Sequence, residues 1–278
     1  MNKKWIWIIV ILLIAVIIFA KCFSNNKNEE EFKPIDKNIG DEFTELSYPN
    51  KMFIVNYEIA DVTGDGEKDM ILLIGEAESG EGLSDATISN MDVVVYDTSN
   101  SQFIKADASK LSGKNNRMTV ADFTGDQILD IMITSDNGKN SARIYTYENG
   151  KLKEIWKERN NKGLVFIGEF KDGFKVEINN KKLNLSKVLD LPSENYVEAS
   201  FYNNSGKLLS DKKSISTSGF TSIEVIKLND RNGLRTLQRI YGMNDNDILD
   251  EIGTVWKYSE GKWQMVEVKG LKLGNLLY

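Results

Sequence analysis

Short apolar stretches separated by polar turns run along the chain from about residue 46 to its end. Within them, β-branched and aromatic side chains recur among polar ones, as in "MFIVNYEIA" and "TSIEVIKL". This pattern is typical of strands with a buried face, and the Asn, Gly, Ser and Asp residues between the stretches are typical of turns. No helical apolar period continues for ten residues or more. The pattern therefore predicts an all-β fold for residues 46–278.

Four of the predicted hairpins share one form, in which a strand ends in a tyrosine, a short turn follows and a second strand returns. The tyrosines lie 51, 55 and 56 residues apart, at Tyr96, Tyr147, Tyr202 and Tyr258. An acidic or glycine-bearing turn precedes each hairpin. Units of this length and content are typical of propeller blades. The sequence predicts about four propeller-blade-like repeats, which could form a closed propeller, an open stack or packed sheets.

The amino terminus has a different pattern. Residues 5–20, "WIWIIVILLIAVIIFA", carry no charge, and an extension to Phe23 gives 19 residues, or roughly 28 Å of helix. We interpret residues 5–23 as a transmembrane anchor. Lys3 and Lys4 predict that residues 1–4 are a cytoplasmic tail and that the rest lies outside the cell membrane. A signal peptide cleaved after Ala20, giving a secreted protein, is the alternative, although Ile18 is bulky for its −3 position.

Residues 24–45, which include "SNNKNEEEFKPIDKNIGDE", are polar, charged and nearly free of periodicity. This composition predicts a flexible linker that separates the anchor from an extracellular β-repeat domain over residues 46–278.

Charge and composition narrow the possible functions. The chain has 41 acidic and 35 basic residues and a net charge of −6, which argues against a general nucleic-acid binder. It contains no histidine, which excludes Ser-His-Asp and Cys-His catalysis. Its single cysteine, Cys22, cannot form an internal disulfide. A metal site would have to use oxygen ligands, and these favour Ca²⁺, Mg²⁺ or Mn²⁺.

Two nine-residue loops place acidic side chains at alternate positions between apolar runs: "DVTGDGEKD" from Asp61 and "DFTGDQILD" from Asp122. A hard divalent cation takes six to eight oxygen ligands, and a turn with ligands at alternate positions can wrap around it. The candidate ligands include the backbone carbonyls of Glu67 and Ile128, and the side chains of Asp61, Thr63, Asp65, Asp69, Asp122, Thr124, Asp126 and Asp130. The alternative is a pair of aspartate-rich turns that hold no metal.

Two features refine the metal hypothesis. A bidentate glutamate at loop position twelve would indicate an EF-hand, but that position is Leu72 in the first loop and Ile133 in the second. Gln127 stands where the first loop has Gly66, so the second turn must adopt a glycine-like conformation at some steric cost. We therefore expect weak calcium binding, with Kd on the order of 10⁻⁴ to 10⁻³ M, and the tighter site in the first loop.

The two loops resemble the calcium loops of FG-GAP or VCBS-type repeats, which are known from integrin α-subunit propellers and bacterial surface proteins. The family pattern is Asp-x-Asp-x-Asp-Gly-x-x-Asp, and Thr63 and Thr124 replace its second aspartate here. The chain is similar to Firmicute membrane-anchored VCBS-repeat-containing proteins. This resemblance implies a non-enzymatic binding or interaction module with an unknown protein or glycan ligand. The turns around Asp172 and Asp230 are interpreted as plain turns without metal.

No spacing in the sequence indicates a general acid and base, a GxSxG nucleophile or a phosphate-binding GxxxxGK loop. We therefore expect no enzymatic activity. Two alternatives stay open: a metal-independent envelope scaffold, and a hydrolase whose active site lies in an unrecognised loop. Trp156, Trp256 and Trp263 fall on predicted hairpin strands and are assigned to the core.

Overall fold

The computed structural model describes residues 34–77, 83, 86–136, 140–157, 162–211 and 214–277. The predicted anchor at residues 5–23 lies outside these residues. In the described part of the chain, no helix is both long and apolar enough to cross a membrane. Residues Ile35–Tyr278 form one compact unit.

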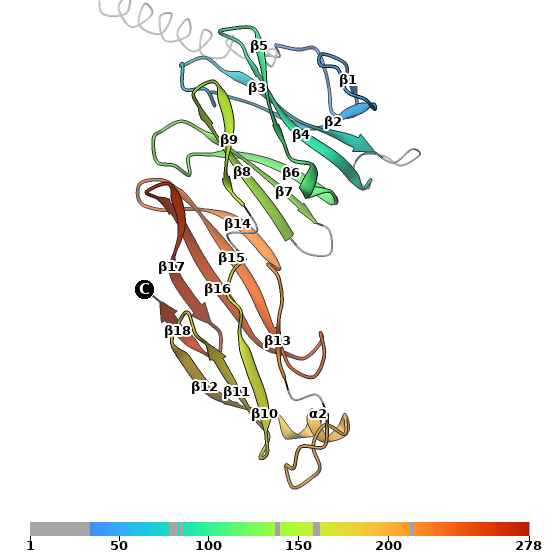
Figure 1. Cartoon of the computed structure of the whole chain (residues 1–278), viewed down its shortest axis with the longest axis vertical. Helices are drawn as coiled ribbons and strands as arrows, with labels where there is room; N and C mark the ends of the chain where they lie inside the picture. The colour runs from blue at the N-terminus through green and yellow to red at the C-terminus, as the bar shows by residue number, and fades with distance from the viewer. Residues whose placement is uncertain are drawn as a thin grey trace, which may run out of the picture. The chain divides into compact units, whose positions relative to one another are not determined.

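The described chain folds into four antiparallel sheets (Figure 1), which confirms the all-β prediction. The first sheet contains β1 (Glu42–Phe43), β2 (Met52–Ala60), β3 (Asp69–Ala77), β4 (Ile88–Asp97) and β5 (Gln102–Asp107). A 3-10 turn, η1 (Ser109–Leu111), leads to the second sheet, which contains β6 (Lys114–Ala121), β7 (Asp130–Asp136), β8 (Asn140–Glu148) and β9 (Lys151–Trp156).

The carboxyl-terminal half contains the other two sheets. The three-stranded sheet consists of β10 (Ile167–Lys171), β11 (Lys175–Asn180) and β12 (Leu185–Asp190), and α2 (Ser193–Glu198) follows it. The six-stranded sheet has the order β13-β15-β16-β17-β18, with β14 also paired to β15. Its strands are β13 (Ser216–Thr217), β14 (Ser222–Lys227), β15 (Asn232–Tyr241), β16 (Ile248–Ser259), β17 (Lys262–Gly270) and β18 (Gly274–Leu277).

Ordered β-structure begins before residue 46, where the sequence pattern placed the end of the linker. β1 pairs with β2 through Glu42 and Phe43. The Phe43 side chain is buried and lies edge-on to Phe103, so apolar burial fixes this short segment against the first sheet.

Three of the four predicted tyrosine hairpins are confirmed. Tyr96 pairs with Phe103, Tyr147 with Leu152 and Tyr258 with Trp263. The turns Asn149-Gly150 and Glu260-Gly261 have positive φ at both residues, which is the geometry of tight two-residue hairpin turns.

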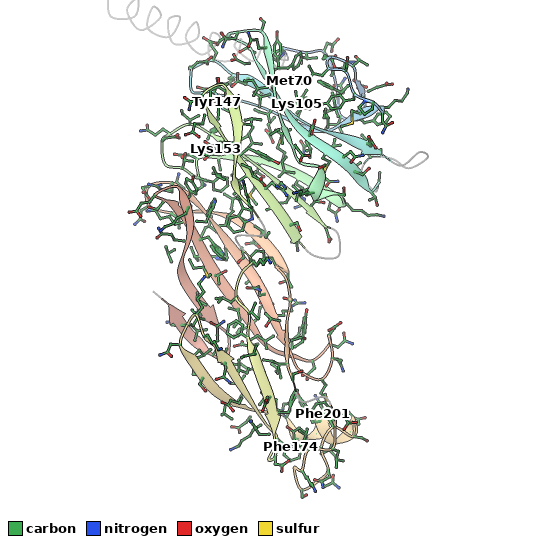
Figure 2. The ribbon with its side chains drawn as sticks, in the orientation of Figure 1. Met70, Lys105, Tyr147, Lys153, Phe174 and Phe201 are labelled. Carbon is green, nitrogen blue, oxygen red and sulfur yellow. The ribbon has the colours of Figure 1, made fainter. Side chains whose placement is uncertain are left out.

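The prediction of a tyrosine hairpin at Tyr202 is wrong. Tyr202 forms only an isolated bridge to Leu208, and α2 precedes it. Its hydroxyl donates a hydrogen bond to the Lys171 carbonyl at 2.8 Å, and the Lys175 carbonyl lies 3.2 Å from the same oxygen. The ring packs against Phe174, and Phe201 packs against Phe170 nearby (Figure 2). Aromatic packing, rather than strand pairing, thus fixes this segment.

The sheets are joined by buried clusters that follow from the alternation of side chains along strands. In β3, Met70, Leu72 and Ile74 belong to a core on one face, while Ile71 and Leu73 belong to a core shared with β7 of the second sheet. The unbroken apolar run of β3 is therefore explained by burial on both faces.

The order of packing differs from the order of the sequence. The second sheet packs on the six-stranded sheet through Phe123, Trp156, Trp256 and Trp263. The six-stranded sheet also shares a core with the three-stranded sheet, which precedes it in the chain. The three tryptophans are buried, as predicted. The first two sheets contain strands that follow one another in the sequence, whereas the carboxyl-terminal half is a three-stranded and a six-stranded sheet around a common core.

Candidate cation loops

The two aspartate loops occupy equivalent hairpin connections. The first joins β2 to β3, where Ala60 pairs with Asp69, and the second joins β6 to β7, where Ala121 pairs with Asp130. We call residues 61–69 the first loop and residues 122–130 the second loop. The shared register shows that the repeated sequence pattern corresponds to a repeated structure.

In the first loop, the carboxylates accept hydrogen bonds from the backbone of their own turn. Asp61 accepts from the amides of Gly64 and Gly66 at 2.7 and 2.9 Å. Asp69 Oδ2 accepts from the amides of Val62 and Thr63 at 3.0 and 3.2 Å, and Asp65 accepts from the Glu67 amide at 2.8 Å. These bonds satisfy amides that the tight turn would otherwise leave unpaired.

The second loop repeats the pattern at the same positions. Asp122 accepts from the amides of Gly125 and Gln127 at 2.5 and 3.0 Å. Asp130 Oδ2 accepts from the amides of Phe123 and Thr124 at 2.8 and 3.0 Å, and Asp126 accepts from the Ile128 amide at 3.0 Å. All five bonds of the first loop thus have a counterpart.

Positive backbone φ angles explain why glycines occupy these loop positions, and Gln127 is the one exception. Gly64 and Gly125 have φ near +80°, and Gly66 has φ of +93°. Gln127, at the position equivalent to Gly66, has φ of +73°. The prediction that Gln127 adopts a glycine-like conformation is therefore confirmed, and a left-handed conformation at a non-glycine residue costs roughly 1–2 kcal/mol.

Three oxygen atoms in the loops are buried without a well-aligned hydrogen-bond partner, although the Thr63 hydroxyl lies close enough to Asp69 to lower the pKa of its carboxyl. The three atoms are Thr63 Oγ1 and Asp69 Oδ1 in the first loop and Thr124 Oγ1 in the second. Asp69 is 0% and Asp130 1% exposed. Burial raises the pKa of Asp69 above its ordinary value and raises the pKa of Asp130 to about 6. An unpaired buried polar atom costs about 1–3 kcal/mol, so these oxygens are available to a ligand that can enter the loop.

The case for a metal ion rests on these buried oxygens, because the acidic side chains do not already converge on one point. Among the described residues, no group of three or more Asp, Glu or Cys side chains converges as a metal site would require. Asp61 and Asp65 use oxygens to brace the turn, while Asp69 Oδ1 and the threonine hydroxyl have the hard-oxygen chemistry that calcium takes. The donor set therefore suits a hard cation, and the calcium hypothesis stays a prediction.

The loops contact their neighbours through their glycines. A β-carbon on Gly64 would lie 2.5 Å from Ile128 Cδ1, so the side chain of the second loop rests directly on the first. A β-carbon on Gly125 would lie 2.5 Å from the Arg231 guanidinium carbon. The apolar Ile128 in a polar loop is a sequence signal of this packing, but its partner could not be read from the sequence.

Arg231, in the turn between β14 and β15, contacts the second loop. Its Nη1 donates to the carbonyls of Thr124, at 2.5 Å, and Tyr258, at 3.0 Å, and its guanidinium also pairs with Asp230. The Asn232 amide donates to the Asp122 carbonyl at 2.6 Å. The arginine of the turn between β14 and β15 therefore buttresses the second loop from outside, and the interpretation of that turn as a plain turn without metal stays a prediction.

Matched glycine substitutions should separate backbone strain from loop packing. Gly64→Ala and Gly66→Ala both place alanine at positive φ, but nothing lies within 4 Å of a β-carbon at Gly66. We expect Gly66→Ala to lower the free energy of unfolding by about 1–2 kcal/mol and Gly64→Ala to lower it by at least about 1 kcal/mol more. Denaturant unfolding measures both, and equal losses would contradict the contact with Ile128.

Comparison with known proteins finds a family model that matches part of the chain. Residues 164–270 match the family model of the YybI C-terminal domain. We call them the YybI-like region; they form most of the three-stranded and six-stranded sheets and lie outside both aspartate loops. The chain is also 28% identical over 214 residues to the uncharacterized protein YybI of Bacillus subtilis (strain 168), an alignment that covers 72% of this chain and 77% of that protein.

Solved structures give more distant likenesses. The rhamnogalacturonan lyase PL11 of Bacillus licheniformis aligns with a TM-score of 0.36 and 14% identity, covering 85% of this chain and 37% of the lyase. The exotype rhamnogalacturonan lyase YesX aligns with a TM-score of 0.34 and 13% identity, covering 86% and 36%. The chain thus spans little more than a third of either lyase, and neither likeness carries a functional argument. The family-model match is confined to the YybI-like region, whereas the alignment with YybI extends over 214 residues.

Proposed function

We propose that the chain is a membrane-anchored, extracytoplasmic β-repeat module that binds a protein or glycan partner and takes calcium in its aspartate loops. The observation that carries the calcium proposal is a pair of buried oxygens in the first loop, Asp69 Oδ1 and Thr63 Oγ1, neither of which has a well-aligned hydrogen bond. The sequence resemblance to FG-GAP or VCBS-type loops supports the same assignment. The anchor, the location and the partner class rest on sequence alone.

Calcium would be held in the first loop by Asp61, Thr63, Asp65, Asp69 and the Glu67 carbonyl. In the second loop, Asp122, Thr124, Asp126, Asp130 and the Ile128 carbonyl would hold it. The bound cation would supply positive charge to carboxylates that are otherwise buried or crowded. The chain's own residues would then keep each hairpin connection rigid, so that the sheets present a fixed surface to a partner.

A metal-independent scaffold is the second candidate, and one observation favours it. Each loop already has five internal hydrogen bonds to its carboxylates, so both turns are braced without a cation. On this account, the aspartates serve only the turns, and stability should not respond to calcium.

Thermal unfolding of the purified full-length chain in mild detergent distinguishes the two. With Kd of about 10⁻⁴ M, calcium at about 1 mM should add roughly 1.4 kcal/mol per site to the free energy of unfolding. Asp61→Ala should remove the first-loop share, while Asp172→Ala, in the plain turn between β10 and β11, should leave the calcium response intact. No shift between chelator and about 10 mM calcium would favour the scaffold.

A further inference from the structure

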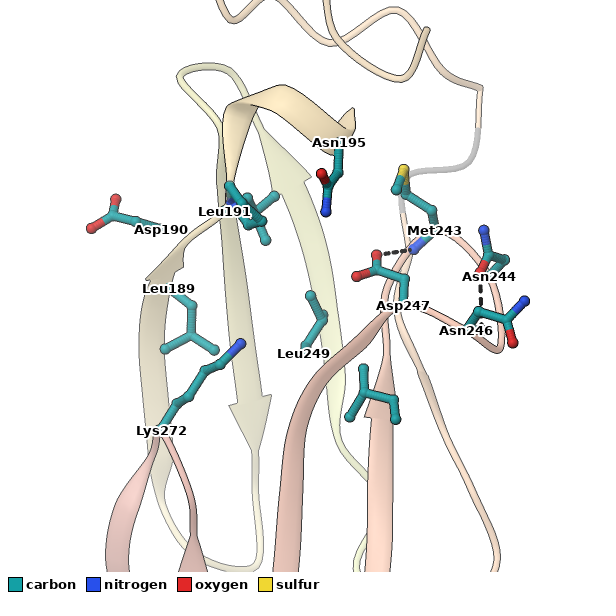
Figure 3. A pocket seen from close by; sticks show the side chains of 12 residues that line it. Leu189, Asp190, Leu191, Asn195, Met243, Asn244, Asn246, Asp247, Leu249 and Lys272 are labelled. Atoms are coloured by element: carbon teal, nitrogen blue, oxygen red, sulfur yellow. Dashed lines mark hydrogen bonds between the residues drawn. The ribbon is translucent and has the colours of Figure 1, made fainter. Parts of the chain in front are cut away.

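A pocket of about 440 Å³ lies at the end of the YybI-like region, away from both aspartate loops. One wall is the end of β12 with the first turn of α2, and the opposite wall is the Met243–Asp247 turn between β15 and β16 (Figure 3). Lys272, from the turn between β17 and β18, completes the lining. Its volume is in the range of small-ligand sites.

Asp247 is held in a fixed position on one wall. Its Oδ2 accepts a hydrogen bond of 2.5 Å from the Tyr196 hydroxyl and one of 2.7 Å from the Met243 amide. A β-carbon at Gly242 would lie 2.2 Å from the same oxygen, so only glycine leaves room for it. These contacts all engage Oδ2 and leave Oδ1 outside them. A carboxylate so fixed is preorganised to meet a cation.

Tyr196 is a protonated hydrogen-bond donor at neutral pH. Its side chain is 1% exposed, and burial together with the hydrogen bond to Asp247 raises the pKa of the phenol well above its ordinary value. The protonated phenol therefore occupies Asp247 Oδ2 and does not compete for the second oxygen.

The rest of the pocket combines an apolar surface with a second charge. Leu191 and Leu249 are buried, and Leu189 lies beside them on β12. The backbone amide of Lys272 donates to Asp250 at 2.9 Å, which fixes the base of the lysine. In Figure 3 its side chain extends towards the pocket from the wall opposite Asp247. Asp190 also belongs to the lining, but in Figure 3 its carboxylate points away from the pocket, so Asp247, the leucines and Lys272 succeed one another across it.

We propose that this pocket binds a primary aliphatic amine whose stem ends in a carboxylate, as a diamino-acid residue of a peptide presents. The ammonium group would pair with Asp247 Oδ1, the methylene stem would cover the leucines, and the carboxylate would meet Lys272. A neutral apolar ligand would instead cover Asp247 and leave a buried charge unpaired, which is strongly unfavourable. Asn195, beside Asp247, offers an amide to the peptide portion.

The contacts of Asp247 also suit a purely structural role, as a link between the turn and α2. The two roles need different properties of the side chain. Linking needs an acceptor oxygen for Tyr196 and Met243, which asparagine keeps. Binding an ammonium group needs the negative charge, which asparagine lacks. Asp247→Asn therefore separates them, and Asp245→Asn, an exposed neighbour in the same turn outside the pocket lining, is the matched control.

The test is calorimetric titration of the full-length chain, in mild detergent and chelator, with 6-aminohexanoate. We expect saturable binding that Asp247→Asn weakens by about 10- to 100-fold, because a charge-assisted hydrogen bond is lost. Asp245→Asn should bind like the wild type. The analogue 6-acetamidohexanoate lacks the charged amine. Its binding to wild type should be as weak as the binding of 6-aminohexanoate to Asp247→Asn, or weaker.

A second variant covers the case in which Asp247→Asn is poorly folded. Lys272→Met keeps the stem of the side chain and should weaken the binding of 6-aminohexanoate. The binding of 6-aminohexanamide, which lacks the carboxylate, should be unchanged. Absence of saturable binding to wild type, or equal binding by wild type and both variants, would overturn the proposal. Since the titration is done in chelator, failure here would leave the calcium proposal untouched.

Discussion

Replacing Trp156 with alanine is expected to lower the free energy of unfolding by about 3–5 kcal/mol. The Trp156 side chain is fully buried between the second sheet and the six-stranded sheet. Its ring lies edge-on to Trp256 and Trp263, with centroids 5.4 and 5.0 Å away. Alanine would remove both aromatic contacts and leave a cavity that this rigid cluster cannot fill. Urea unfolding followed by far-ultraviolet circular dichroism measures the loss without depending on tryptophan fluorescence.

The control for this substitution is Tyr147→Ala on β8, a half-buried aromatic residue of the same sheet that lies outside the tryptophan cluster. We expect it to cost clearly less than Trp156→Ala. Because the tryptophan cluster joins the two halves of the fold, Trp156→Ala should also broaden the transition or split it in two. A loss below about 1 kcal/mol with one sharp transition would show that the halves are held together elsewhere.

Replacing Asp130 with asparagine is expected to stabilise the protein at neutral pH in chelator, by up to about 3 kcal/mol. Burial raises the pKa of Asp130 from 3.8 to about 6. Between these values the folded state binds more protons than the unfolded state, so the stability contributed by this group is full below about pH 4 and is lost as pH rises through about 6. A shift of about two units corresponds to roughly 3 kcal/mol.

The measurement is the free energy of unfolding in chelator at several pH values between about 4 and 8. Wild type should lose stability across this range relative to Asp130→Asn, and the two should converge near pH 4. Asp245→Asn, an exposed aspartate in the turn between β15 and β16, should keep the wild-type profile. If Asp130→Asn were instead less stable than wild type at pH 7 in chelator, the charged carboxylate would be a net stabilising group, contrary to this account.

The strand content and the two aspartate loops follow from local sequence signals. Alternating apolar residues predict the strands, Asn149-Gly150 predicts a tight turn, and the spacing from Asp61 to Asp69 predicts a hairpin connection with Gly66 at positive φ. These features depend on residues close together in the chain, and the structure contains them. The burial of Trp156 could also be anticipated, because a large aromatic residue on a strand is usually core.

Features that depend on distant residues could not be predicted. Tyr202 has the same local context as the other hairpin tyrosines, but contacts with Lys171 and Phe174 decide its structure. The second sheet packs on the six-stranded sheet, although the three-stranded sheet lies between them in the sequence. The side chain of Arg231 reaches the Thr124 carbonyl, 107 residues away. Each of these features depends on which surfaces pack together in the fold, and the hydrophobic periodicity of the sequence carries no information about that.

The most direct test of the central claim is a count of calcium ions bound by the full-length chain, by equilibrium dialysis against labelled calcium. The account predicts saturable binding with Kd on the order of 10⁻⁴ to 10⁻³ M. Asp61→Ala should abolish the tighter site, Asp122→Ala should affect only the weaker one, and Asp172→Ala should change neither. Absence of binding up to about 10 mM, or binding that survives Asp61→Ala and Asp122→Ala together, would contradict calcium sites in the aspartate loops.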